Sequence, residues 1–202
     1  MRNISNKNQR KGVLLAFAGI MFITPDSLLI RLADINSWNL IFYRGFIPFL
    51  TILTGLIFIY RSSLFKKILD NGWHGLAFVV SFAITSIVFV VSIENTNVAN
   101  TLIMISLTPF ATAILSSVFL KEHPNKRMWF TIIVCFVVVL FIFYDSYQGN
   151  RFFGDIFGLF TAILVGGSAV VVRYGKVVNF LPALLLSKLF TMAIAISLMH
   201  SF

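Results

Sequence analysis

Long apolar segments separated by short polar turns recur along the whole chain. A helix needs about 20 apolar residues to cross the hydrocarbon core of a bilayer. Backbone polar groups inside a bilayer must pair within their own segment, so each segment is predicted to be a helix despite its many β-branched and aromatic residues. The pattern therefore predicts an all-α integral membrane protein, a multi-span helical bundle. Its seven expected spans are residues 12–32, 39–60, 73–93, 98–120, 127–144, 154–173 and 180–202.

Composition supports this class of protein and excludes others. Of the 202 residues, 58% are hydrophobic and 11% are charged, which is outside the range of ordinary soluble domains. The net charge of +9 would suggest nucleic acid in a soluble protein, but here the charges lie at the ends of apolar segments. We therefore expect membrane lipid, and no nucleic acid, among the partners.

The distribution of Lys and Arg predicts the orientation. Cytoplasmic turns of membrane proteins carry an excess of these residues. With residues 1–11 as a basic cytoplasmic N-terminus, the outer turns carry only Arg31 and Arg151. We therefore expect a multi-pass protein of the cell's inner (plasma) membrane with its N-terminus in the cytoplasm. The inner segments then hold Arg2, Lys7, Arg10, Lys11, Arg61, Lys66, Lys67, Lys121, Lys126, Arg127, Arg173 and Lys176.

The outline of the first span returns in the sixth, since residues 12–31 and 154–173 both begin with Gly and end with Arg. Thr24, Pro25 and Asp26 in the first copy fall opposite Gly166, Gly167 and Ser168 in the second. Pro and paired Gly both weaken a helix, so each copy combines a break with a polar side chain at the same depth. Broken helices of this kind face the central site in secondary transporters. We therefore expect Pro25, Gly166 and Gly167 to be structural or gating positions.

The second copy begins after a unit of five spans, an odd number, which makes it inverted in the membrane. Residues 12–145 are then a first repeat of five spans, and residues 154–202 are the first two spans of an incomplete second repeat. Three interpretations stay open: a fragment of a ten-span protein, a truncated protein, or a chain that assembles with a partner, for example as a homodimer.

Motifs from the first span to the start of the fifth follow a consistent order. Tyr43 and Arg44 lie early in the second span, residues 92–100 form the third turn, Pro109 lies inside the fourth span, and residues 119–122 lead into the fifth. In this order and spacing the chain resembles the EamA family of the drug/metabolite transporter (DMT) superfamily. It departs from the family pattern in the fifth span, where glycines are usual and this chain has Thr131, Cys135 and Val138. The resemblance implies a ten-span carrier of small organic metabolites, often an exporter of amino acids.

Asp26 is the only carboxylate well inside a predicted span. Ionisable groups inside membranes are costly and mark functional sites by default. Beside the backbone defect at Pro25, this carboxylate is a candidate contact for a substrate amine or for a coupled proton. A structural ion pair explains it equally well.

Two cations complete the candidate site. Arg44 lies roughly 8 Å below the outer end of its span, the same depth as Asp26, so the two residues could pair or jointly hold a zwitterion. Snorkelling of Arg44 to the interface is the alternative. Lys188 lies roughly 12 Å from the inner end of the seventh span and is the repeat counterpart of Arg44. Two cations against one carboxylate favour an anionic or zwitterionic substrate.

Further candidates are polar residues that enter spans. Asn100 and Thr101 enter the fourth span and are expected to face a cavity, as is Ser168 in the sixth. Pro109 is expected to kink the fourth span and serve packing or gating. Glu122 is expected to cap a helix or to pair with Lys121 or Lys126.

The sequence predicts a secondary transporter, a probable exporter of small organic metabolites such as amino acids, that works by alternating access around a midplane site. It contains no nucleotide-binding loop, catalytic dyad or metal-ligand spacing, so no enzyme, cofactor or metal site is expected. The main alternative is a truncated, non-transporting membrane protein or assembly partner. A channel or a receptor is a further alternative, and a retinal-binding protein is disfavoured by the orientation. Substrate, direction and coupling ion do not follow from the sequence.

Overall fold

The computed structural model describes residues 12–15, 17–19, 21, 25–32, 35–60, 72–122, 124–149, 151–175 and 180–199. These residues form helices and turns, without a strand in any described range. The chain divides into two units, Met1–Asp34 and Ile35–Phe202, and each unit is described by itself.

The described part of the first unit contains the short helix α2, Asp26–Leu32. It begins directly after Pro25, whose carbonyl oxygen accepts a hydrogen bond from the Leu29 amide at 2.9 Å. Because residues 22–24 lie outside the described residues, the break expected at Pro25 stays a prediction. Several residues of the predicted first span lie outside the described residues, so a continuous span there stays a prediction.

Among the described residues of the second unit, six spans are long and apolar enough to cross a membrane. This finding confirms the predicted all-α multi-span architecture. One of the six consists of two shorter helices in sequence, α6 and α7. The helices are α3 (Ser37–Tyr60), α5 (Gly72–Asn95), α6 (Val98–Ser106), α7 (Thr108–Phe119), α8 (Lys126–Gln148), α9 (Phe152–Tyr174) and α10 (Leu181–Met199).

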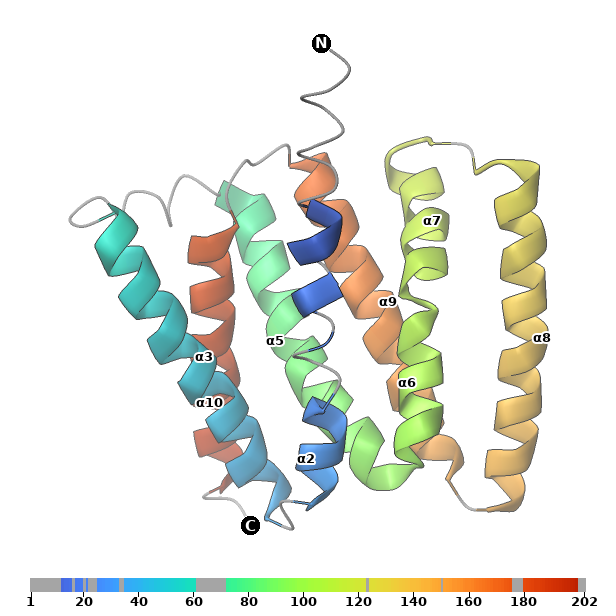
Figure 1. Cartoon of the computed structure of the whole chain (residues 1–202), viewed down its shortest axis with the longest axis horizontal. Coiled ribbons are helices and arrows are strands. Elements are labelled where there is room, and N and C mark those ends of the chain that lie inside the picture. The colour runs from blue at the N-terminus through green and yellow to red at the C-terminus, as the bar shows by residue number, and fades with distance from the viewer. Residues whose placement is uncertain are drawn as a thin grey trace. The chain divides into compact units, whose positions relative to one another are not determined.

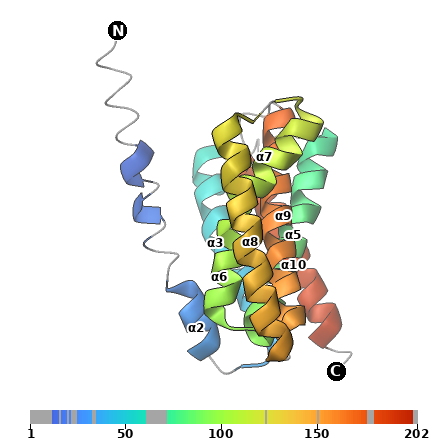
Figure 2. The same ribbon diagram turned by 90° about the vertical axis from the view of Figure 1, so that its right-hand side faces the viewer.

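Helices distant in sequence lie side by side in this unit (Figure 1). The central pair is α5 and α9; α10 packs between α5 and α3, while α6 and α7 pack on α9. Helix α8 contacts the unit mainly through α9 and stands at its edge, at the right in Figure 1 and in front of the other helices in Figure 2. A small core of Phe78, Val79 and Ala183 joins α5 to α10.

The two ends of this unit differ in charge. Lys121, Lys126, Arg127 and Arg173 lie at one end, where α7 and α9 end and α8 begins. We call this the basic end, and the other end the opposite end. Because the predicted orientation places these residues inside, the basic end is the expected cytoplasmic end.

The fourth span is broken where its sequence contains Pro109. Helix α6 ends at Ser106 and α7 begins at Thr108, and the Leu107 amide bonds to the Met104 carbonyl at 3.1 Å. Pro at the first turn of α7 is favourable because its missing N–H would have no partner there. The expected kink at Pro109 is therefore a junction between two helices.

The sixth span differs from expectation. Helix α9 runs unbroken through Gly166 and Gly167, so the helix break expected there is wrong. A Cβ atom added to Gly166 would lie 2.9 Å from the Thr112 amide nitrogen and 3.1 Å from the Ala111 Cβ. Gly166 is instead a point of close approach between α9 and α7, a common use of small residues in membrane helices.

Candidate functional site

Helices α3 and α10 cross at Gly45. A Cβ atom added there would lie 3.2 Å from the carbonyl oxygen of Lys188 and 2.7 Å from the Cγ of Met192. Arg44 directly precedes Gly45 on α3, and Lys188 is the residue of α10 that Gly45 contacts. The two cations predicted from separate spans therefore lie on two helices that contact each other at this point.

Both cations contact the same helix, α5. The Arg44 guanidinium lies 4.9 Å from the centre of the Phe89 ring. The Lys188 ammonium lies 5.3 Å from the centre of the Phe82 ring and 3.3 Å from the Ser86 hydroxyl. Positions 82, 86 and 89 have the spacing of one helix face. We call these five residues the cation face.

The chemistry of the cation face suits a negatively charged group. Arg44 and Lys188 are both partly buried between long apolar helices. Aromatic rings compensate a cation only in part, by about 0.5–2 kcal/mol. An anionic group that binds near either charge would form a charge-assisted hydrogen bond with it.

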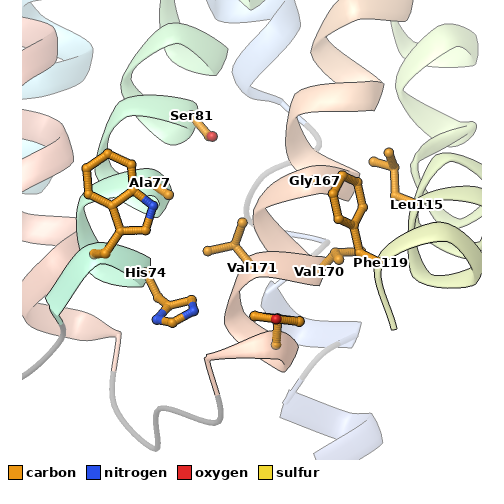
Figure 3. Close-up of a pocket in the computed structure, with 10 residues that line it drawn as sticks. His74, Ala77, Ser81, Leu115, Phe119, Gly167, Val170 and Val171 are labelled. Carbon is orange, nitrogen blue, oxygen red and sulfur yellow. The ribbon is translucent and has the colours of Figure 1, made fainter. Parts of the chain in front are cut away.

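A groove opens beside α5 at the basic end. It measures about 400 Å³ and is bounded by α5, α7 and α9 (Figure 3). Ser81 and Gly167 line its deeper part, while His74 lies near the helix ends. The remaining lining is apolar and aromatic: Trp73, Ala77, Leu115, Phe119, Val170, Val171 and Tyr174. None of these lining residues belongs to the cation face, and a groove of this size could hold a small organic molecule.

A buried hydrogen-bond network lies at the opposite end. The Ser92 hydroxyl donates to the Gly154 carbonyl at 2.8 Å and lies 2.9 Å from the Thr101 hydroxyl. Thr96 donates to one Asp155 carboxylate oxygen at 2.6 Å, and the Asn100 amide lies 3.4 Å from the other. The network ties the turn between α5 and α6 to the start of α9.

Asp155 is a buried carboxylate that the sequence analysis did not select as a candidate. It lies in the first turn of α9 and is fully buried. Carboxylates stabilise the first turn of a helix, where backbone N–H groups lack partners. The sequence offered one signal for this network: an acidic residue, Asp155, just inside the start of a span, and Thr96 and Asn100 at an earlier turn.

The structure separates the other predicted site residues. Asp26 is partly buried in the first unit. Asn100 also donates to Ser146 at 3.1 Å, which places it, with buried Thr101, in the network at the opposite end. Ser168 is buried and donates to the Leu164 carbonyl of its own helix at 2.8 Å. Substrate contacts for these residues, and a pair between Asp26 and Arg44, stay predictions.

Glu122 forms an ion pair, but with a different partner from those expected. Its carboxylate accepts a hydrogen bond from Arg173, at the end of α9. This pair links the segment after α7 to the end of α9 at the basic end. Within the described ranges, His, Cys, Asp and Glu do not form a group of three that could hold a metal ion.

Comparison with known proteins adds one match. The model of the EamA-like transporter family matches residues 10–144. No curated protein and no solved structure matches the chain. The matched region contains Arg44 and the α5 part of the cation face.

Proposed function

Since this chain belongs to the EamA-like transporter family of DMT-type membrane transporters, we propose that the cation face binds the negative group of a small organic anion or zwitterion during transport. The family places the chain in lipid and implies small-molecule substrates. The observation that supports this substrate class is that Arg44 of α3 and Lys188 of α10 both contact the same face of α5. Amino acids, which carry a carboxylate beside an ammonium group, fit such a site.

The proposed mechanism is secondary transport by alternating access, with export as the direction. In this mechanism residues 12–145 form one repeat and residues 154–202 contribute to the inverted second repeat. The crossing at Gly45 brings a helix of each repeat together, which is where a midplane site of such carriers lies. A substrate held by Arg44 and Lys188 would therefore contact both repeats and sense their relative movement.

In this mechanism the two ends of the second unit would open to the substrate in turn. In this proposal the substrate enters from the basic end, which would face the cytoplasm across the inner membrane. The Asp155 network would keep the opposite end closed until the substrate is released. Opening there requires the turn between α5 and α6 to separate from α9, breaking buried hydrogen bonds.

Asp26 is proposed to add either a contact for the substrate amine or a proton-coupling site. Replacing Asp26 with Asn keeps the shape of the side chain and removes its charge. If Asp26 couples transport to protons, the variant loses the pH dependence of uptake. A pH dependence that is unchanged would remove Asp26 from this role.

The function is tested by flux into liposomes that contain the purified chain. Radiolabelled glutamate, leucine and lysine represent an anion, a zwitterion and a cation. We expect saturable flux of glutamate or leucine, and at least about tenfold less flux after Lys188→Gln or Arg44→Gln, because a charge-assisted hydrogen bond is lost. Lys126→Gln removes a charge at the basic end away from the cation face and serves as the matched control.

Two results would contradict this function. A correctly inserted chain that transports none of the three substrates would favour the non-transporting membrane protein or assembly partner. Transport of lysine alone, unaffected by Lys188→Gln, would retain the carrier but exclude the anionic or zwitterionic substrate class.

A further inference from the structure

A second pocket, more polar than the groove beside α5, lies at the basic end between α7, the start of α8 and the end of α9. It measures about 370 Å³, and none of its lining residues belongs to the cation face. The lining residues that carry polar or flexible side chains are Thr112, Ser116, Glu122, Asn125, Met128 and Arg173. A pocket of this volume suits a small molecule or a lipid headgroup.

Ser116 is the unexplained residue of this pocket. It is 3% exposed, and its hydroxyl has no hydrogen-bond partner in the described part of the chain. Buried polar atoms in proteins are nearly always paired. A hydroxyl inside a helix usually donates to the carbonyl four residues earlier, as Thr112 does to Thr108 at 2.8 Å. Ser116 lines the pocket, so its unpaired hydroxyl is a group that a ligand bound there could satisfy after a small rotation of the side chain.

Glu122 and Arg173 provide both signs of charge in the same pocket. Their side chains are about half exposed, at 49% and 50%. A guanidinium has five N–H donors and a carboxylate has two acceptor oxygens. Their mutual bond uses one donor and one oxygen, so the remaining groups can bind a ligand without breaking the ion pair.

We propose that this pocket binds a zwitterion that carries an anionic group next to a primary ammonium group. The anionic group bonds to the Arg173 guanidinium and the Ser116 hydroxyl, and the ammonium group bonds to the Glu122 carboxylate. A lone anion is repelled by Glu122, and a lone cation is repelled by Arg173. The ligand has two sources: a phospholipid headgroup such as phosphatidylethanolamine, or a free zwitterion such as glycine or phosphoethanolamine.

Thermal unfolding of the delipidated full chain in detergent distinguishes these sources. Phosphatidylethanolamine should raise the Tm in a saturable way. Phosphatidylcholine, whose methylated ammonium cannot donate hydrogen bonds, and phosphatidylglycerol, which has no ammonium, should raise it less. A shift with glycine or phosphoethanolamine and none with the phospholipids assigns a free zwitterion. Equal shifts for the three phospholipids, without a shift for either free zwitterion, would overturn the proposal.

Variants locate the binding. Glu122→Gln and Arg173→Gln should each weaken it about tenfold, through loss of a charged hydrogen bond. Ser116→Ala removes only an unpaired hydroxyl, so the ligand-free protein should unfold at the same Tm or higher while binding weakens. Arg127→Gln, also at the basic end, is the matched control and should bind normally. Binding that is unchanged in all three pocket variants would also overturn the proposal.

This inference is independent of the proposed function. Arg44→Gln and Lys188→Gln should leave the ligand-dependent rise in Tm intact, even where they abolish flux. Failure of one proposal therefore leaves the other testable.

Discussion

Gly45 of α3 lies directly against Lys188 of α10, so close that a Cβ atom at Gly45 would come within 3.2 Å of the Lys188 carbonyl oxygen. The contact joins the second predicted span to the seventh. It also fixes the position from which Lys188 extends to α5. The proposed site therefore requires a small residue at position 45, where α3 and α10 cross.

The first prediction follows from this contact. Gly45→Leu should destabilise the protein by about 1–3 kcal/mol, because the side chain has no room against α10. Gly55→Ala on the same helix is the matched control, since nothing lies within 4 Å of its added Cβ. There the stability should stay the same or rise, because Ala is the better helix former. Thermal unfolding measures both, and equal losses would contradict the close crossing.

The second prediction concerns the contact between Arg44 and Phe89. A double-mutant cycle with Arg44→Gln and Phe89→Leu should give a coupling energy of about 0.5–2 kcal/mol in unfolding free energy. The same cycle with Phe58→Leu should give no coupling, because Phe58 is 86% exposed. A coupling near zero with Phe89 would remove this ring from the cation face.

The third prediction tests the network at the opposite end. Thr96→Val should cost about 1–3 kcal/mol of stability, since it leaves the buried Asp155 carboxylate without its closest donor. Thr96→Ser keeps the hydroxyl and should cost less. Asp145→Asn alters an exposed carboxylate near the same end and should have little effect. A larger loss from Thr96→Ser than from Thr96→Val would exclude the hydrogen bond as the cause.

The fourth prediction separates two adjacent glycines of α9. Gly166→Ala should destabilise the protein, because its Cβ would lie 2.9 Å from the Thr112 backbone nitrogen. At Gly167 the nearest atom would lie 3.7 Å away, an ordinary contact, so Gly167→Ala should be tolerated. If the pair acted as a hinge instead, both substitutions should reduce flux to a similar degree.

The sequence predicted the spans well and their packing poorly. The second span was expected over residues 39–60 and is Ser37–Tyr60 in the structure. Hydropathy marks a span because lipid acts on each segment separately. Which helices pack together depends instead on which face of each helix meets its neighbour. The hydrophobic pattern of the sequence does not show this when every face of a helix is apolar.

The candidate site was predicted as residues but not as an arrangement. Arg44 and Lys188 were recognisable because charge inside a span is rare. Their common contact with α5 depends on the rotation of three helices, and Phe82 and Phe89 resemble the other phenylalanines in the sequence. Gly166 was interpreted as a break because composition alone does not distinguish a weak helix from a close helix contact.

The most direct test of the cation face is the rate of cysteine alkylation at Ser86, which lies between Phe82 and Phe89 on α5. The single native cysteine is first removed as Cys135→Ser, and then Ser86→Cys and, as control, Asn97→Cys in the exposed turn before α6 are compared. We predict that the transported anion or zwitterion slows alkylation at Ser86→Cys several-fold and leaves Asn97→Cys unchanged. A transported substrate that protects neither position would contradict binding at Arg44 and Lys188.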